Sequence, residues 1–161
     1  PYPGKIIPVD LKQSGGKIIV QKDGFLCAAL GTKISIHLNR KLGAGLIGGE
    51  GFILQKLECD GLLFKHAGRT VIEKNLINET LRIDTGCIVA YEPRNDFNIE
   101  TAGRLKSMVF GGEGLFLATL KGTGKVWLQS MPIRKLIQRL SPTGGNVRKE
   151  SRSILGDFLE R

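Results

Sequence analysis

The sequence Asp84-Thr85-Gly86, which follows Leu81 and Ile83, is the Asp-Thr-Gly string of aspartic proteases. Those enzymes need two carboxylates that share one proton and come from two lobes or two subunits. The corresponding stretch earlier in the chain is Lys22-Asp23-Gly24, in which the glycine keeps its place and the aspartate does not. We therefore interpret Asp84-Thr85-Gly86 as a turn that enters a strand, and we expect an Asp84→Asn variant to keep the properties of the protein.

A second motif, Gly43-Ala44-Gly45-Leu46-Ile47-Gly48, matches the glycine pattern of dinucleotide-binding loops. Dinucleotide binding requires that loop to open a helix whose N-terminus holds the pyrophosphate. Here a glycine-rich bend and a strand follow instead, and the later corresponding stretch has Lys106 and Met108 at the first two glycine places. The motif is typical of a loop, and the sequence predicts no cofactor-binding residue.

Glu50 and Glu113 occupy the same place in two similar stretches, Gly48-Gly49-Glu50-Gly51 and Gly111-Gly112-Glu113-Gly114. Paired carboxylates could perform acid–base chemistry or bind a cation. A feature that occurs once in each structural unit is more often structural. We expect each carboxylate to accept backbone N–H groups of its own glycine bend, while an unrecognised enzyme that uses the two glutamates remains an alternative.

The other residues that could do chemistry are isolated in the sequence. His37 and His66 have no metal-ligand spacing around them, and no Ser/His/Asp or Cys/His set emerges. The three cysteines, Cys27, Cys59 and Cys87, lie in or beside apolar runs, and their odd number argues against a disulfide framework. We expect them to be mostly buried in a reducing, cytoplasmic compartment. The sequence predicts no catalytic residue, metal ligand or cofactor.

The net charge of +9 permits nucleic acid, anionic lipid or acidic protein as partners. A cluster of basic residues surrounds the second glycine-rich turn and the segment after it: Lys121, Lys125, Arg134, Lys135 and Arg139. Single-strand binding usually also uses exposed aromatic side chains, which this sequence does not offer. Binding of RNA or DNA is therefore an alternative that charge alone supports.

Short apolar runs separated by glycine-rich turns predict an all-β chain. Pro8 indicates that the first strand lies at a sheet edge. Alternation of Ile34 and Ile36 with polar residues predicts a half-buried strand. The expected strands in the first part of the chain are Lys5–Leu11, Lys17–Gln21, Phe25–Leu30 and Lys33–Leu38.

Two hairpins are expected, each after a glycine bend. In the first, Phe52–Leu57 pairs with Leu62–His66 across a turn that contains Asp60-Gly61, because glycine accepts the positive φ of such a turn. In the second, Leu115–Leu120 pairs with the strand that starts at Val126, across Lys121–Lys125. A further turn region is expected at Asn75–Thr80, and Trp127 is expected in a core or an interface.

The two hairpins belong to an internal repeat. The shift that carries Gly48 onto Gly111 superposes the two glycine bends and places Phe64 on Trp127, and one gap brings Gly24 onto Gly86. Residues 1–131 thus form one repeated β domain, with copies at about 1–66 and 67–131, and we expect a further copy before them. Because the hairpin strands are apolar on both faces, one face can meet the opposite sheet and the other a second subunit.

Residues 132–161 follow the β domain as a short helix and a basic tail. Pro132 suits the first turn of a helix, and Ile133, Leu136, Ile137 and Leu140 follow helical spacing. The tail has an apolar stripe that could meet a membrane surface or a partner helix.

Several of these motifs in this order resemble a known family. Gly48–Gln55, Gly111–Leu120 with Val126–Ser130, and Lys22–Ala28 with Asp84–Ala90 are similar to the bacterial branch of the altered-inheritance-of-mitochondria (mitochondrial biogenesis) proteins, a family of unknown function. The resemblance covers about residues 1–140. It implies a fold like the tryptophan RNA-binding attenuation protein, with repeated β-sandwich or double-stranded β-helix units, and often a trimer. It carries over no catalytic residue.

We therefore expect an all-β protein of repeated β-sandwich or double-stranded β-helix units with a short C-terminal helix. The favoured function is a non-enzymatic, homo-oligomeric β scaffold, a trimer by the family resemblance, that binds a protein or membrane-associated partner.

Overall fold

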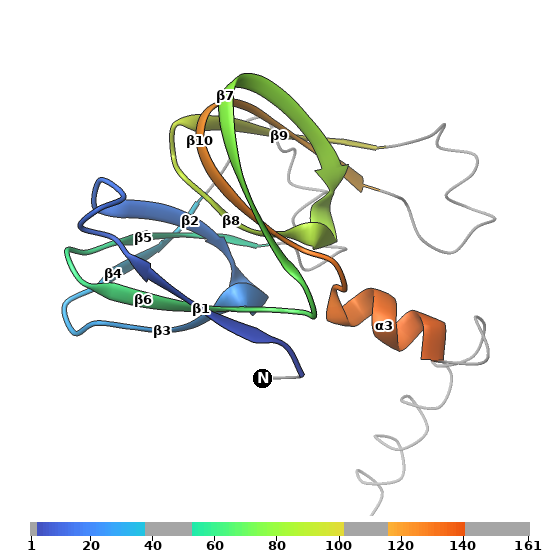
Figure 1. Ribbon diagram of the computed structural model, residues 1–161, viewed down its shortest axis with the longest axis horizontal. Helices are drawn as coiled ribbons and strands as arrows, with labels where there is room; N and C mark the ends of the chain where they lie inside the picture. The colour runs from blue at the N-terminus through green and yellow to red at the C-terminus, as the bar shows by residue number, and fades with distance from the viewer. Residues whose placement is uncertain (1–2, 38–52, 102–115, 141–161) are drawn as a thin grey trace, which may run out of the picture.

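The computed structural model describes residues 3–37, 53–101 and 116–140, and it confirms an all-β fold with a short C-terminal helix (Figure 1). In chain order the elements are β1 Lys5–Asp10, β2 Lys17–Gln21, the 3₁₀ turn η1 Lys22–Gly24, β3 Phe25–Ala28, β4 Lys33–Ile36, β5 Leu54–Glu58, β6 Leu62–Ala67, β7 Val71–Asp84, the 3₁₀ turn η2 Thr85–Cys87, β8 Ile88–Tyr91, β9 Asn95–Thr101, β10 Phe116–Gln129 and α3 Ile133–Leu140.

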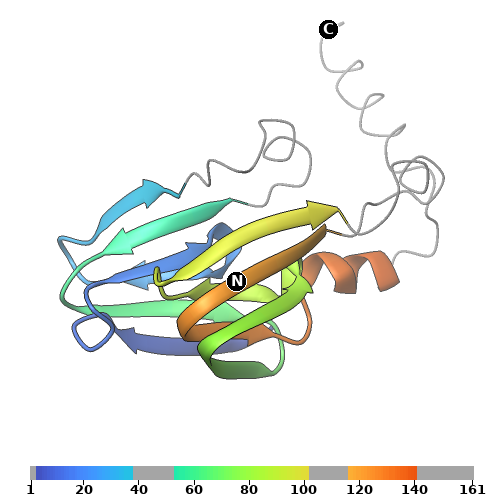
Figure 2. The ribbon, with the colours of Figure 1, turned by 90° about the horizontal axis from the view of Figure 1, so that it is seen from above.

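The strands form two sheets, and all the pairings among the described strands are antiparallel. The smaller sheet has the order β1-β6-β3, and the larger has the order β4-β5-β2-β8-β10-β7. β9 also pairs with β10, on the edge of β10 that β8 uses. Figure 2 shows the larger sheet curling from β4 to β7. β1 is an edge strand, as Pro8 predicts.

Two apolar clusters form the core, one on each face of the larger sheet. The first lies between the sheets and includes Ile18 and Val20 of β2, whereas the second lies inside the curl of β7, β9 and β10 and includes Ile19. Successive strand residues point to opposite faces, so β2 is covered on both. In β10, Trp127 joins the first cluster and Leu120 the second. The chain itself therefore covers both faces of its central strands.

The first expected hairpin does not form. β5 pairs with β2 and β4, whereas β6 pairs with β1 and β3 in the other sheet. The Cys59–Gly61 segment carries the chain from the larger sheet to the smaller one. Two backbone hydrogen bonds fix it: Cys59 N donates to Gly16 O at 3.1 Å, and Leu11 N donates to Gly61 O at 3.1 Å. The prediction was wrong because two other strands, rather than each other, satisfy the backbone groups of β5 and β6.

The second expected hairpin is also wrong, because residues 116–129 form one continuous strand, β10. Gly122 and Gly124 lie within it at φ 148° and 153°, backbone conformations that only glycine adopts readily. A Cβ atom at Gly122 would lie 2.7 Å from the carbonyl oxygen of Arg94. These glycines bend the strand instead of reversing it.

The turn expected at Asn75–Thr80 lies inside β7, which runs unbroken beside β10. Asn78 adopts a φ of 52°, and its backbone N–H donates to Thr123 Oγ1 at 3.0 Å. Asparagine tolerates this left-handed conformation better than most residues. The residues that suggested a turn therefore bend β7 alongside the glycine bend of β10.

β4 was expected to be half-buried, but all four of its residues are exposed. It forms one end of the larger sheet, and Ile34 and Ile36 are 51% and 67% exposed. The alternation of the sequence is correct, but nothing in the described chain covers the face on which these isoleucines lie. β3 likewise ends at Ala28, two residues earlier than expected.

The helix expected from Pro132 is present as α3, which begins at Ile133. Leu136 N donates to Pro132 O at 3.1 Å, so proline stands at the helix start. Ile137 and Leu140 are exposed. No helix in the described ranges has the length and apolar character needed to cross a membrane.

Candidate functional site

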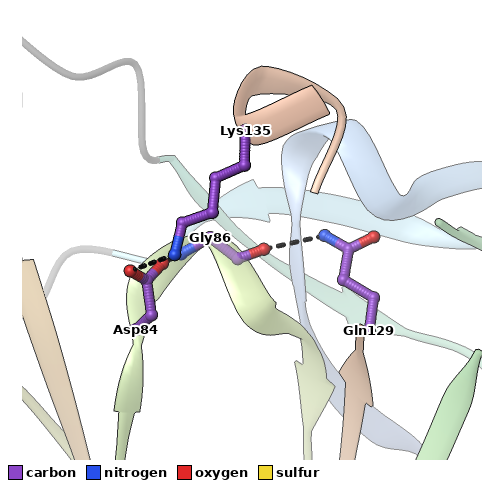
Figure 3. Close-up of polar contacts among 4 residues, drawn as sticks. All are labelled: Asp84, Gly86, Gln129 and Lys135. Atoms are coloured by element: carbon purple, nitrogen blue, oxygen red, sulfur yellow. Dashed lines mark hydrogen bonds and ion pairs between the residues drawn. The ribbon is translucent and has the colours of Figure 1, made fainter. Parts of the chain in front are cut away.

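Asp84, the residue of the protease-like motif, caps a turn and anchors the helix. Its Oδ1 accepts the backbone N–H of Gly86 at 2.9 Å, which starts the 3₁₀ turn η2. Its Oδ2 forms an ion pair with Lys135 Nζ of α3 at 2.6 Å (Figure 3). Both carboxylate oxygens therefore have partners, and the expectation of a turn that enters a strand is confirmed.

Gln129, at the end of β10, joins the same turn to the rest of the fold, a role that the sequence analysis did not identify. Its Nε2 donates to Gly86 O at 2.8 Å (Figure 3), and its Oε1 accepts the N–H of Gly68 at 2.8 Å. A Cβ atom at Gly68 would collide with the carbonyl group of Met131. The region is closely packed, and the amide of Gln129 forms hydrogen bonds with the backbone of both Gly86 and Gly68.

The first half of the chain has a turn of the same kind. Gln21 Oε1 accepts the N–H of Asp23 at 2.7 Å and caps η1, as Asp84 caps η2. The shift that carries Gly48 onto Gly111 also carries Gln21 onto Asp84, so the two turns correspond without a gap. The gapped alignment of Gly24 with Gly86 is therefore wrong. A glutamine can perform the role of Asp84, which identifies that role as capping.

Lys65 is a fully buried lysine that the sequence analysis missed. Its Nζ lies 3.4 Å from the ring centroid of Trp127 and has no hydrogen-bond partner among the described residues. Burial lowers the pKa of Lys65 to about 6, although nearby Glu73 raises it. The ring face favours the charged form by only about 2 kcal/mol, less than the cost of burying an ammonium group.

The alternation of side chains along β6 could have indicated that Lys65 is buried. Leu63 and Ala67 point into the first cluster, and residue 65 lies on the same face between them. Lys65 is 0% exposed, so solvent does not reach this amine in the described structure. The expectation that Trp127 lies in the core is confirmed, since it is 2% exposed.

The histidines and cysteines form no metal-binding cluster within the described parts of the chain. No three His, Cys, Asp or Glu side chains within the described parts of the chain are placed to hold a metal ion. His66 is buried, and burial, with a smaller effect of Lys56, lowers the pKa of His37. All three cysteines are free. Cys59 and Cys87 are partly buried, but Cys27 is exposed on β3, so the expectation of burial is wrong there.

The basic residues of the proposed nucleic-acid face are spread over two elements. Lys125, on β10, forms an ion pair with Glu73 at 3.7 Å, and Lys135, on α3, forms the pair with Asp84. Lys121 is exposed on β10. The side chains of Arg134 and Arg139 lie outside the described residues, as do Gly43–Gly48, Glu50 and Glu113.

The features with binding potential are strand edges that carry exposed apolar side chains. β3 ends the smaller sheet with Leu26 and Cys27 exposed, and β4 ends the larger sheet with Ile34 and Ile36 exposed. An edge strand presents unpaired N–H and C=O groups that can pair with another strand. Among the described residues, the arrangement offers association surfaces rather than a set of converging reactive groups.

Comparison with protein families gives one match over most of the chain. The model of the family described as "Mitochondrial biogenesis AIM24" matches residues 1–131. The chain belongs to this family. The match covers the whole β domain and ends just before α3, and it agrees with the family resemblance of the motifs. A comparison with curated proteins gives no match.

Comparison with solved structures supports the family's fold. The X-ray structure of a Streptococcus pyogenes protein, determined by a structural genomics consortium, is similar with a TM-score of 0.70 and 20% sequence identity. The similarity covers 86% of the present chain and 60% of the S. pyogenes chain. The present chain therefore spans about three fifths of that protein, and the likeness shows a shared fold.

Proposed function

We propose that this AIM24-family chain is a non-enzymatic, homo-oligomeric β scaffold that binds a protein or membrane-associated partner. The observation that carries the proposal is the pair of uncovered apolar strands, β3 and β4, in a molecule whose central strands are covered on both faces. Exposed apolar surface of this kind marks an interaction site.

The surroundings of the reactive side chains support a role without catalysis. Asp84 is held by a turn and an ion pair, and Lys65 lies in the core. A general acid or base must lie within hydrogen-bond reach of a bound substrate, whereas Lys65 is fully buried and both carboxylate oxygens of Asp84 already have partners. We accordingly propose binding as the activity. The three free thiols support the proposal of a cytoplasmic location.

The mass of the 161-residue chain in solution tests the oligomeric part of the proposal. Multi-angle light scattering should give about three times the chain mass of 17.6 kDa, the trimer implied by the family resemblance. A mass near 17.6 kDa at all concentrations up to about 100 µM would contradict it, because an obligate scaffold cannot be stable as a monomer there.

Binding of RNA is the alternative function, and the net charge of +9 favours it. The ion pairs of Lys125 and Lys135 reduce the cationic surface available to phosphate groups. A labelled RNA should therefore show no shift at 50 mM salt. Binding that weakens steeply with salt would instead favour the RNA alternative.

A further inference from the structure

The contact between Lys65 and Trp127 joins the two halves of the chain. Lys65 lies on β6 of the first half, and Trp127 lies on β10 of the second. The Lys65 side chain is completely buried, and its Nζ lies 3.4 Å from the centroid of the indole ring. The protonation state of one amine therefore affects the packing of one half on the other.

The strands that flank Lys65 in the smaller sheet present apolar side chains to it. Ile7 of β1 lies opposite Lys65 on one side, and Phe25 of β3 lies opposite it on the other. Ile7 belongs to the first apolar cluster, and Phe25 packs against that cluster. His66, the next residue of β6, points to the opposite face of the strand. The immediate surroundings of the amine therefore favour its neutral form.

Two charged side chains of the second half, Glu73 and Lys125, act on Lys65. Glu73 lies directly opposite Trp127 in the pairing of β7 with β10. Lys125 precedes Trp127 by two residues, so it lies on the same face of β10, and its Nζ is 5.6 Å from the ring centroid. Lys125 and Glu73 form an ion pair at 3.7 Å, and their side chains are 40% and 49% exposed. The indole thus has two lysines near it and one carboxylate beside it.

The Glu73 carboxylate interacts with both lysines but pairs with one of them. It forms the ion pair with Lys125, while the Lys65 amine has no hydrogen-bond partner among the described residues. Burial is the main cause that lowers the pKa of Lys65; Glu73 raises this pKa, and Lys125 lowers it. An aromatic face can accept an N–H of a neutral amine and can also hold an ammonium group. Trp127 can accordingly contact Lys65 in both protonation states, whereas only the charged state attracts Glu73.

We propose that Lys65 and Lys125 exchange Glu73 when the Lys65 amine gains a proton. While the amine is neutral, Glu73 stays paired with Lys125. In mild acid a proton from the solvent, which enters through local opening of the fold, converts Lys65 to an ammonium group. This group takes the carboxylate of Glu73 beside Trp127 and releases Lys125 to the solvent. The exchange makes the contact between the halves a proton-operated switch, and it does not depend on the oligomeric state of the protein.

The difference in burial between the two lysines determines the direction of the exchange. The Lys125 side chain is 40% exposed, so its ammonium group keeps much of its hydration without a carboxylate. A buried ammonium group at Lys65 lacks that hydration and needs a paired carboxylate. Once both lysines are charged, Glu73 therefore lowers the free energy more beside Lys65 than beside Lys125.

The fluorescence of Trp127, the single tryptophan of the chain, tests the switch. Because an ammonium group beside an indole changes its emission, titration of the wild type should show a transition with a midpoint near pH 6, the pKa of Lys65. Lys65→Met should abolish the transition, and the far-ultraviolet circular dichroism should stay constant across it. Constant emission between pH 8 and pH 5, a transition that persists in Lys65→Met, or loss of circular dichroism at the same midpoint would each overturn the proposal.

Substitution of the two partners should shift the midpoint in opposite directions. Glu73→Gln should move it to lower pH by at least about half a unit, because the Lys65 ammonium group loses its carboxylate, and Lys125→Met should move it to higher pH, because Glu73 is then free. The Lys74–Glu79 ion pair supplies matched controls, since its side chains are 40% and 48% exposed. Lys74→Met and Glu79→Gln should leave the midpoint unchanged, and shifts equal to those of the test variants would overturn the assignment to Glu73.

Combining the two variants separates an exchange from two independent charges. Independent charges would give Lys125→Met the same effect on the midpoint in the wild type and in the Glu73→Gln background. In an exchange, the shift caused by Lys125→Met should be at least about twofold larger when Glu73 is present, because only then is a carboxylate released to Lys65. Equal shifts in the two backgrounds would overturn the exchange. The proposed scaffold function would stand in either case, since its test is the mass in solution.

Discussion

β3 and β8 occupy the same place in the two halves of the molecule and have opposite surroundings. Each follows a capped 3₁₀ turn, and each pairs with the strand that ends its half, β6 or the second part of β10. β8 is buried because β2 pairs with its other edge, whereas β3 lacks such a neighbour in the described chain. The neighbouring strand therefore decides whether the same local design becomes core or surface.

The largest difference in stability should appear when an aspartate is introduced into each of the two strands. Val89 is 1% exposed and its counterpart Leu26 is 37% exposed. Val89→Asp should lower the free energy of unfolding by about 3–5 kcal/mol, because it buries an unpaired charge. Leu26→Asp should lower it by less than about 1 kcal/mol in the monomer. Urea unfolding measures both, and equal losses would show that β3 is as enclosed as β8.

The bend within β10 and the turn between β3 and β4 also differ, and a glycine substitution in each tests that difference. Gly122→Ala should destabilise the protein by about 3 kcal/mol, since φ is 148° and the new Cβ would press on the carbonyl oxygen of Arg94. Gly31→Ala, at φ 87° with open space around it, should cost about 1 kcal/mol. Thermal unfolding compares them. A tolerated Gly122→Ala would contradict the bent strand.

Lys65 in β6 corresponds to Leu128 in β10, so replacing the lysine by leucine gives the two halves the same residue at this position. Lys65→Leu should stabilise the protein by about 1–4 kcal/mol at pH 7. The pKa of Lys65 is about 6 when folded and has its ordinary value of 10.5 when unfolded. The unfolded chain thus binds the extra proton, and wild-type stability should rise between these pH values.

The variant should lose that dependence on pH. Urea unfolding at pH 6.5, 8 and 9.5 for both chains measures it, with Lys56→Leu as a control at a partly exposed lysine. An equal slope for wild type and Lys65→Leu would show that Lys65 is charged in the fold.

The smallest effect is expected at the turns. Asp84→Asn keeps a side-chain oxygen that can cap η2 and loses the ion pair with Lys135, a partly exposed pair worth about 0–1 kcal/mol. Gln21→Ala, which removes the cap of η1, should cost about 1 kcal/mol. If Asp84→Asn costs several kcal/mol in thermal unfolding, the aspartate has a role beyond capping and anchoring.

Local sequence patterns predicted the elements well and their partners poorly. Short apolar runs between turns identified β2 and β6, alternation identified β4, and Pro132 identified the start of α3. The expected hairpins failed because Asp60-Gly61 and Gly122–Gly124 suit a reversal, a corner or a bend equally well on local grounds. Which of these forms depends on strands distant in sequence, β1 and β3 in one half and β7 and β9 in the other.

Side-chain roles were predictable only where they were local. The turn at Asp84 depends on its own neighbours, and its interpretation was correct. The exposure of Cys27 and Ile34 depends on which strands lie beside them, and no pattern within β3 or β4 reports that. Lys65 was visible as a charge between two apolar positions, but its contact with Trp127 depends on packing between the two halves.

Hydrogen exchange at β3 tests the account most directly. At 1 µM, peptides covering residues 25–28 should exchange at least about tenfold faster than peptides covering residues 88–91, because the described chain pairs one edge of β3 but both edges of β8. Exchange at residues 25–28 that is as slow as exchange at residues 88–91 would contradict the account, because β3 would then be as enclosed as β8.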